Sequence, residues 1–175
     1  GTFQSAANYT VGKEPQHIAA GDFNGDRRRD LAAVSNDPAG NRVSVLFGEG
    51  NGTFKEAVPY VLPGYLKSIA VGDFNRDGHP DLVTGGQQPR ILLNDGQGGF
   101  PSYFIYPLGG NPDHVAVEDF NGDGWPDLAI ADSFFNRVSV LLNETGMLSN
   151  QTPARAGGAV TIPAASRLSG PASGN

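Results

Sequence analysis

The chain has 175 residues, 38% of them hydrophobic, and no cysteine, so disulfides and cysteine-based zinc sites are excluded. Its formal net charge of −6 argues against a nucleic-acid partner, because phosphate groups attract basic surfaces. No apolar run approaches the roughly 18 residues of a membrane span. We therefore expect neither nucleic-acid binding nor a membrane span.

The first predicted strand is the segment GTFQSAANYTV at residues 1–11. Related segments follow as GTFKEAVPYVL from Gly52 and GFPSYFIYPL from Gly99. Each contains a phenylalanine 19 residues before the first aspartate of an acidic segment, namely Phe3, Phe54 and Phe100. This constant spacing indicates that the segments occupy the same place in a repeating unit.

The acidic segments are the clearest repeat. They are IAAGDFNGDRRRDLAAV (residues 18–34), IAVGDFNRDGHPDLVTG (69–85) and VAVEDFNGDGWPDLAIA (115–131), with first aspartates 51 and then 46 residues apart. A similar apolar run follows each: RVSVLFGEG from Arg42, RILLNDG from Arg90 and RVSVLLNE from Arg137. Short apolar stretches between turn residues predict strands. Each unit should read strand, acidic turn, strand, turn, strand, glycine-rich turn, strand.

Four short strands in about 46–51 residues is the size of one propeller blade. We predict an all-β fold of β-propeller blades with four antiparallel strands each, about three per chain, over residues 1–144. The blades are expected at residues 18–63, 69–108 and 115–143. The alternatives are a β-solenoid, whose coils are usually shorter, and a β-sandwich, which has no reason to repeat so closely.

The number of predicted strands is too small for one chain to form a closed propeller ring. The third blade lacks its own fourth strand, whereas residues 1–11 are a spare one. Because about four blades is the minimum for closure, either two chains self-associate into about six blades or the chain is part of a longer ring. A further option is that AVTI at residues 159–162 supplies the missing strand. Residues 145–175, rich in Ala, Gly, Ser and Pro, are expected to be a tail or linker.

The acidic turns predict metal sites. Counted from the first aspartate, positions 1, 3, 5 and 9 carry side-chain oxygens, and position 7 varies, as expected if it contributes only its backbone carbonyl. Oxygens converging from a tight loop suit Ca²⁺, which takes six to eight such ligands at about 2.3–2.6 Å. The predicted ligands are Asp22, Asn24, Asp26, Arg28 and Asp30 in the first loop, Asp73, Asn75, Asp77, His79 and Asp81 in the second, and Asp119, Asn121, Asp123, Trp125 and Asp127 in the third.

Two alternatives compete with calcium. An Asp/Asn/Gly turn can simply cap a hairpin, and Mg²⁺ prefers few protein ligands and retained waters. The loops also differ at position 6, where Gly78 and Gly124 suit a turn with positive φ but the first loop has Arg27. We therefore expect two or three Ca²⁺ per chain, with the weakest site around Asp22.

The sequence DFNGDGWPDLAIA followed by RVSVLL, with GNGTF between copies, resembles the FG-GAP/VCBS repeat of integrin α-subunit propellers and of many bacterial and fungal extracellular proteins. The resemblance covers about residues 1–143. It implies propeller blades whose first hairpin loop binds structural Ca²⁺, and a secreted or cell-surface setting. Arg27 and the small number of repeats depart from the family pattern.

The expected function is an extracellular calcium-stabilised module that binds protein or carbohydrate, as in adhesion proteins or lectins. Trp125 and the pair Phe134–Phe135 are candidate stacking platforms, although for the pair packing between blades is the favoured interpretation. The alternatives are a non-catalytic propeller portion of a larger secreted enzyme, or a self-assembly element. We expect no catalysis by this chain, because it has three histidines and neither a GxSxG nor an HExxH motif.

Overall fold

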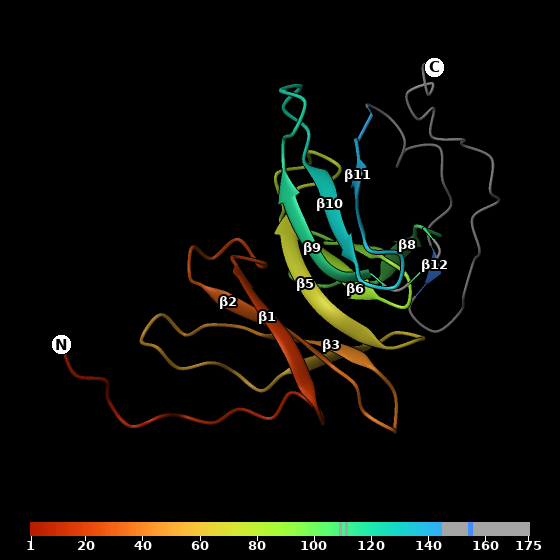
Figure 1. Ribbon diagram of the computed structural model, residues 1–175. Helices are drawn as coiled ribbons and strands as arrows, with labels where there is room; N and C mark the ends of the chain where they lie inside the picture. The colour runs from red at the N-terminus through yellow and green to blue at the C-terminus, as the bar shows by residue number, and fades with distance from the viewer. Residues whose placement is uncertain (109, 111, 145–153, 156–175) are drawn as a thin grey trace, which may run out of the picture.

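The computed structural model describes residues 1–108, 110, 112–144 and the backbone of residues 154–155. Within these ranges the chain forms strands and no helix, as predicted (Figure 1). None of the described residues therefore belongs to a helix that could cross a membrane. The strands form antiparallel sheets that do not close into a ring.

The first sheet, blade 1, has four strands that pair in chain order. They are β1 (Pro15–Gly21), β2 (Asp30–Ser35), β3 (Arg42–Leu46) and β4 (Val58–Val61). Blade 2 has the same order, with β5 (Leu66–Gly72), β6 (Asp81–Gly86), β7 (Arg90–Leu93) and β8 (Ser102–Ile105). Blade 3 has β9 (Pro112–Glu118), β10 (Asp127–Asp132) and β11 (Arg137–Leu141). The predicted blades, including the three-stranded third one, are confirmed.

The expected N-terminal strand is wrong. Residues 1–14 form no strand and extend from blade 1, as Figure 1 shows. A strand needs a neighbouring backbone to satisfy its N–H and C=O groups, and none of the described strands pairs with this segment. The short strand β12 (Ala154–Arg155) pairs with β8 of blade 2. It does not complete blade 3, and residues 159–162, the other candidate for that place, lie outside the described residues.

The hydrophobic cores lie between blades. One core joins blade 1 to blade 2 and includes Phe23, Val45, Leu66 and Phe100. A second core joins blade 2 to blade 3 and includes Phe74. Side chains alternate along each strand, so the middle blade supplies one face to each core. The innermost strand of the middle blade, β5, contacts both β1 and β9.

The strand register shows which residues of blades 1 and 2 are equivalent. Leu31 of β2 pairs with Leu46 of β3, and the equivalent Leu82 of β6 pairs with Leu92 of β7. Arg90 therefore corresponds to Ser44 and not to Arg42. The third strand of blade 2 is shorter at its start, so the arginines that begin the apolar runs of blades 1 and 2 are not equivalent.

Candidate metal centre

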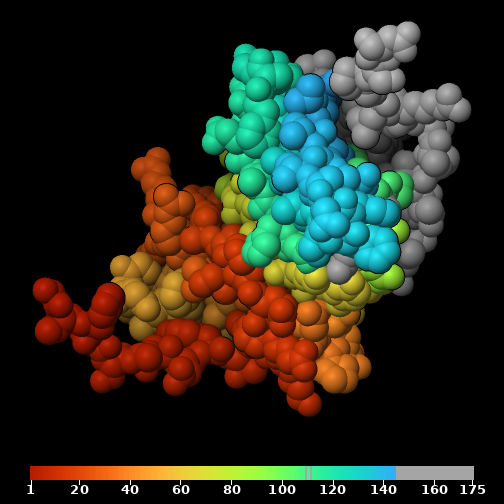
Figure 2. Space-filling view, viewed as in Figure 1, coloured from red at the N-terminus to blue at the C-terminus, as the bar shows by residue number. Residues whose placement is uncertain are grey.

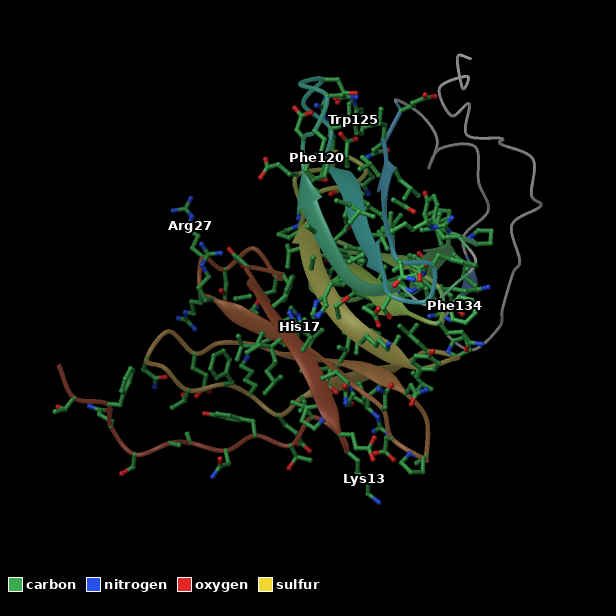
Figure 3. All side chains as sticks on the ribbon, viewed as in Figure 1. Lys13, His17, Arg27, Phe120, Trp125 and Phe134 are labelled. Carbon is green, nitrogen blue, oxygen red and sulfur yellow. The ribbon has the colours of Figure 1, made fainter. Side chains whose placement is uncertain are left out.

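Each acidic loop connects the innermost strand of its blade to the second strand: β1 to β2, β5 to β6, and β9 to β10. The three blades form a curved row, here called the arc, and their shared strand order places these loops along one rim of it. Figure 3 shows Arg27 in the first loop and Phe120 and Trp125 in the third projecting at that rim. Each loop therefore carries its own set of sequence-predicted ligands, and the three loops lie along one rim.

The loop backbone turns sharply at positions 4 and 6. Both positions have positive φ in every loop: Gly25 at 73° and Arg27 at 65°, Arg76 at 56° and Gly78 at 85°, Gly122 at 78° and Gly124 at 83°. The expectation for position 6 is confirmed, whereas the requirement at position 4 was missed. Gly25 and Gly122 in the sequence were its signal. The third loop alone has glycine at both turns, so the first two each hold one arginine in a costly conformation.

Backbone amides hold the carboxylates of positions 1 and 5 in each loop. In the third loop Asp119 Oδ2 accepts from the Gly124 amide at 2.7 Å, and Asp123 Oδ1 accepts from the Trp125 amide at 2.8 Å. The Asn121 Oδ1 atom accepts from the Asp123 amide at 2.9 Å. The first and second loops repeat all three hydrogen bonds, with distances of 2.8–3.1 Å. The loops thus share one hydrogen-bonded conformation.

The aspartate at position 9 of each loop is buried and connects two backbone segments through hydrogen bonds. Asp81 is fully buried, and its two oxygens accept from the Phe74 amide at 3.0 Å and from the Asn94 amide at 2.8 Å. Asp30 and Asp127 are equally buried and make the equivalent pairs of bonds. Burial, with smaller contributions from the Asp77 and Asp73 carboxylates, raises the pKa of Asp81 to about 7 despite these donors. A cation nearby would reverse that shift.

The side chains at position 7 contact residues outside their own loops. The Trp125 ring packs under the Arg76 guanidinium, 4.1 Å from its centroid, and Arg76 also donates to the Asp123 carbonyl at 3.2 Å. A methyl group added at Gly96 would lie 2.9 Å from His79 Nε2, so His79 lies against the glycine-rich turn. Arg28 lies in the same way against Gly50. These contacts engage the side chains at position 7, and the role of its backbone carbonyl as a ligand stays a prediction.

The fit to a cation is partial. The Asp22 Oδ1 atom is buried without a hydrogen-bond partner, which is the kind of oxygen a cation would satisfy. Nevertheless, no group of three or more Asp, Glu, His or Cys side chains in the described ranges comes close enough together to hold a metal. The loops supply hard oxygen donors on an ordered backbone, and binding would require their side chains to turn toward a common point.

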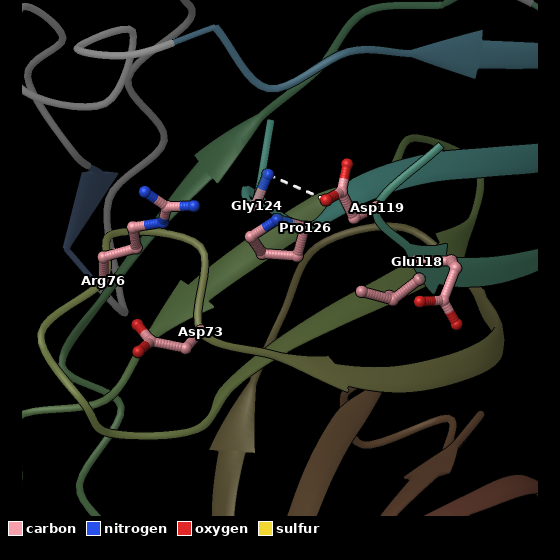
Figure 4. A pocket seen from close by; sticks show the side chains of 7 residues that line it. Asp73, Arg76, Glu118, Asp119, Gly124 and Pro126 are labelled. Carbon is pink, nitrogen blue, oxygen red and sulfur yellow. Dashed lines mark hydrogen bonds between the residues drawn. The ribbon is translucent and has the colours of Figure 1, made fainter. Parts of the chain in front are cut away.

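A shallow pocket separates the second and third loops (Figure 4). Its volume is about 460 Å³. Asp73 and Arg76 line one side, and Asp119, Gly124 and Pro126 line the other, as Figure 4 shows. The pocket therefore lies between two candidate metal loops and carries groups of both charges.

Sequence reasoning missed the polar contacts that join blades at the loops. The Asn94 side chain, after β7, donates to the Phe23 carbonyl of the first loop at 2.8 Å. The Asn143 side chain, after β11, donates to the Phe74 carbonyl of the second loop at 3.1 Å. The repeated asparagine in RILLN and RVSVLLN was the available signal, although blade 1 has Gly48 at this place.

The aromatic candidates and histidines have separate positions. Phe134 and Phe135 are 70% and 48% exposed and form an edge-to-face pair, with Arg137 above Phe135. They do not pack between the described blades. His17 of β1 and His114 of β9 meet edge to face with centroids 5.8 Å apart, on the innermost strands and remote from Trp125.

The comparison with known families agrees with this repeat geometry. A family model described as an FG-GAP-like repeat matches residues 22–84 and 82–130. The chain belongs to the FG-GAP repeat family. The first FG-GAP match covers the first and second acidic loops, and the second match covers the third loop. A search of curated proteins found no match.

Proposed function

We propose that this FG-GAP chain is an extracellular calcium-binding β-propeller module that binds a protein or carbohydrate ligand. The observation that carries the proposal is the threefold recurrence of one loop, with the same hydrogen bonds and the same spacing of oxygen donors. Asparagine oxygens can also accept backbone amides, as Asn121 does, so a turn alone does not require carboxylates at positions 1, 5 and 9 together. Packed carboxylates repel one another, and a divalent cation compensates that repulsion.

The proposed ions are structural. Asp, Asn and backbone carbonyl groups would hold Ca²⁺, which neutralises the loop carboxylates and ties the first two strands of each blade together. We expect two or three ions per chain. The first loop should bind most weakly, because Arg27 has a positive φ and lies in a run of three arginines. The third loop should bind most tightly, because both of its turn positions are glycine.

Calcium titration calorimetry tests this proposal. The wild-type chain should bind two or three Ca²⁺, and Asp123→Asn should remove one because it abolishes the negative charge at position 5 of the third loop. Asp95→Asn is the matched control, since Asp95 is an exposed turn aspartate outside the acidic loops that also accepts backbone amides. Absence of calcium binding by the wild-type chain would leave the loops as ordinary hairpin turns and overturn the proposal.

The proposed ligand site is the pocket between the second and third loops. It presents Arg76, Glu118 and Asp119 close to Trp125, whose ring is partly exposed and is covered by Arg76 on one face. Polar groups next to an aromatic ring suit a sugar or a polar peptide. In this proposal the chain has no catalytic role, so a larger enzyme that carried it would keep its chemistry elsewhere. A glycan array and Trp125→Ala would test the carbohydrate class.

A further inference from the structure

The last blade has an uncovered face. In blades 1 and 2 the phenylalanine at position 2 of the acidic loop inserts against the next blade, and Phe23 and Phe74 are 0% and 1% exposed. The equivalent Phe120 of blade 3 is 47% exposed. Beside it, Val138 and Val140 of β11 are 68% and 52% exposed. Figure 2 shows this part of blade 3, coloured cyan to blue, at the surface.

The first blade has the complementary uncovered face. Ile69 of β5 points toward blade 1 and is 1% exposed, whereas the equivalent Ile18 of β1 is 61% exposed. Blade 1 thus lacks a preceding blade, and blade 3 lacks a following one, among the residues that the structure describes. Each end face repeats the chemistry of a face that is buried between blades 1 and 2.

The N-terminal segment already lies where an outer strand of a preceding blade would lie. Tyr60 of β4 packs edge to face on Phe100 of the next blade, with centroids 5.6 Å apart and an angle of 86°. Tyr9 packs on Phe54 of blade 1 in the same way, at 5.5 Å and 85°. Residues 9–11 therefore contact blade 1 as β4 contacts blade 2, but among the described residues they belong to no sheet.

Two serines fix this position. The Val11 carbonyl accepts from the hydroxyl groups of Ser35 and Ser44 at 2.8 and 3.0 Å. Residues 1–8 are exposed and have no strand partner. At the other end of the arc, β11 pairs with β10 only, and no described residue pairs with its outer edge. An unpaired edge of this kind recruits another strand.

We propose that β11 of one chain pairs with the N-terminal segment of a second copy, so that blade 3 of one chain packs on blade 1 of the other. The template is the pairing of β3 with β4, because β3 and β11 share the sequence RVSVL. Residues 7–10 lie 51 positions before β4 in the repeat. Transferring that register gives the pairs Arg137–Thr10, Val138–Tyr9, Ser139–Asn8 and Val140–Ala7.

A second copy suits these faces in charge as well as in shape. Neighbouring loops lie side by side at the rim, as Asp73 and Asp119 do across the pocket. The contact would place the acidic third loop of one chain beside Arg27–Arg29 of the first loop of the other. Two such contacts, related by a twofold axis, would close about six blades. Gly48 supplies no counterpart of Asn94, so the contact lacks that one hydrogen bond.

The first test is sedimentation equilibrium of the 175-residue chain over a wide concentration range. A reversible dimer is expected with and without added calcium, because apolar packing and strand pairing carry the contact. A monomer at every concentration under both conditions would overturn the proposal. Since the calcium proposal is tested by ion binding, the two proposals can fail separately.

Cross-linking tests the register, and the chain has no native cysteine to interfere. Asn8→Cys and Ser139→Cys are made in separate chains, mixed, and treated with a short thiol–thiol cross-linker. The mixture should give a cross-linked dimer. Asn51→Cys replaces Asn8→Cys in the control, since Asn51 is an exposed turn residue outside the proposed strand pairs. Cross-linking only within one chain that carries both Asn8→Cys and Ser139→Cys would overturn the proposal, because the strand would then close intramolecularly.

Substitutions at the surface test the contact without disturbing a core. Val138→Lys and Ile18→Lys should each weaken dimerisation at least tenfold, while the thermal unfolding of the dilute monomer stays near wild type. Val58→Lys is the matched control, because Val58 is an exposed valine on β4, on the face toward blade 2. A dimer that tolerates both Val138→Lys and Ile18→Lys would use other surfaces and would contradict the proposed pairing.

Discussion

Strands β3 and β11 have the same sequence, RVSVL, and opposite environments. In β3, Val43 and Val45 are fully buried in the core between blades 1 and 2. In β11, the equivalent Val138 and Val140 are more than half exposed. Both strands pair with the second strand of their blade in the same register. The local sequence therefore determines the strand, whereas the neighbouring blade determines which strands are buried.

This comparison explains how the arc is held together. A single blade is a thin sheet that cannot bury either face alone, so each contact between blades provides the core for both partners. Blade 2 is covered on both faces, and each end blade is covered on one. Substitutions at equivalent positions should therefore have different effects in the middle and at the ends of the arc.

The largest difference should appear at the loop phenylalanines. Phe23→Ala removes a fully buried ring between blades and should lower the free energy of unfolding by about 3–5 kcal/mol. Phe120→Ala should lower it by less than about 1 kcal/mol, because much of that ring is already in contact with water. Urea denaturation of both variants at low protein concentration measures the difference. Equal losses would show that Phe120 is covered in the folded monomer.

Strands β3 and β11, which share the sequence RVSVL, should show a smaller difference of the same kind. Val45→Ala should cost about 2 kcal/mol, because it removes buried methyl groups and leaves a cavity. Val140→Ala, the same change at the equivalent position, should cost less than about 0.5 kcal/mol. The pair is its own control, since sequence and strand register are shared. A large effect at Val140 in the dilute monomer would contradict the open end of blade 3.

The contact between blades 2 and 3 should depend on Asn143. Asn143→Ala removes the donor to the Phe74 carbonyl and should cost about 1 kcal/mol. Asn8→Ala, at an exposed position, should have no measurable effect in the monomer. Hydrogen exchange would locate the change: the amides of β9–β11 should exchange faster in Asn143→Ala, and those of β1–β4 should not. Uniform acceleration over all blades would show that the blades do not open separately.

The smallest effect should come from the ion pair between β5 and β9. Lys67 and Asp113 form a salt bridge, and this contact together with Ser133 lowers the pKa of Asp113 to about 2. Because the folded pKa lies below the ordinary value, the stabilisation is complete above pH 4 and is lost as the pH falls from about 4 to 2. Asp113→Asn should cost roughly 0.5 kcal/mol at pH 7. The difference from wild type should vanish in acid, and a difference unchanged at pH 2 would show that charge is not its cause.

Much of the fold could be predicted because its signals are local. Turn residues, alternating apolar positions and a repeating unit of 46–51 residues specify hairpins and their order, and these signals predicted the three blades. The expected strand at residues 1–11 was wrong because a strand also needs a partner, which the sequence of the segment does not contain. The exposure of Phe120 has the same origin, since burial depends on what packs beside the blade.

The loops show the same limit. The oxygen donors and the turn at position 6 follow from the spacing of DFNGD and its copies, and the structure places them in one hydrogen-bonded loop conformation. The positive φ of Arg76 was hidden because arginine gives no sequence signal for it. The Asn94 contact with Phe23 was hidden because it joins residues 71 positions apart across two blades.

The calcium proposal is tested most directly by a native mass spectrum of the chain, recorded in calcium and again after chelation. The proposal predicts two or three calcium ions per chain that are lost on chelation. As the calcium concentration falls, the first loop should lose its ion before the other loops do. A chain that carries no calcium under native conditions, and whose fold is the same before and after chelation, would contradict it.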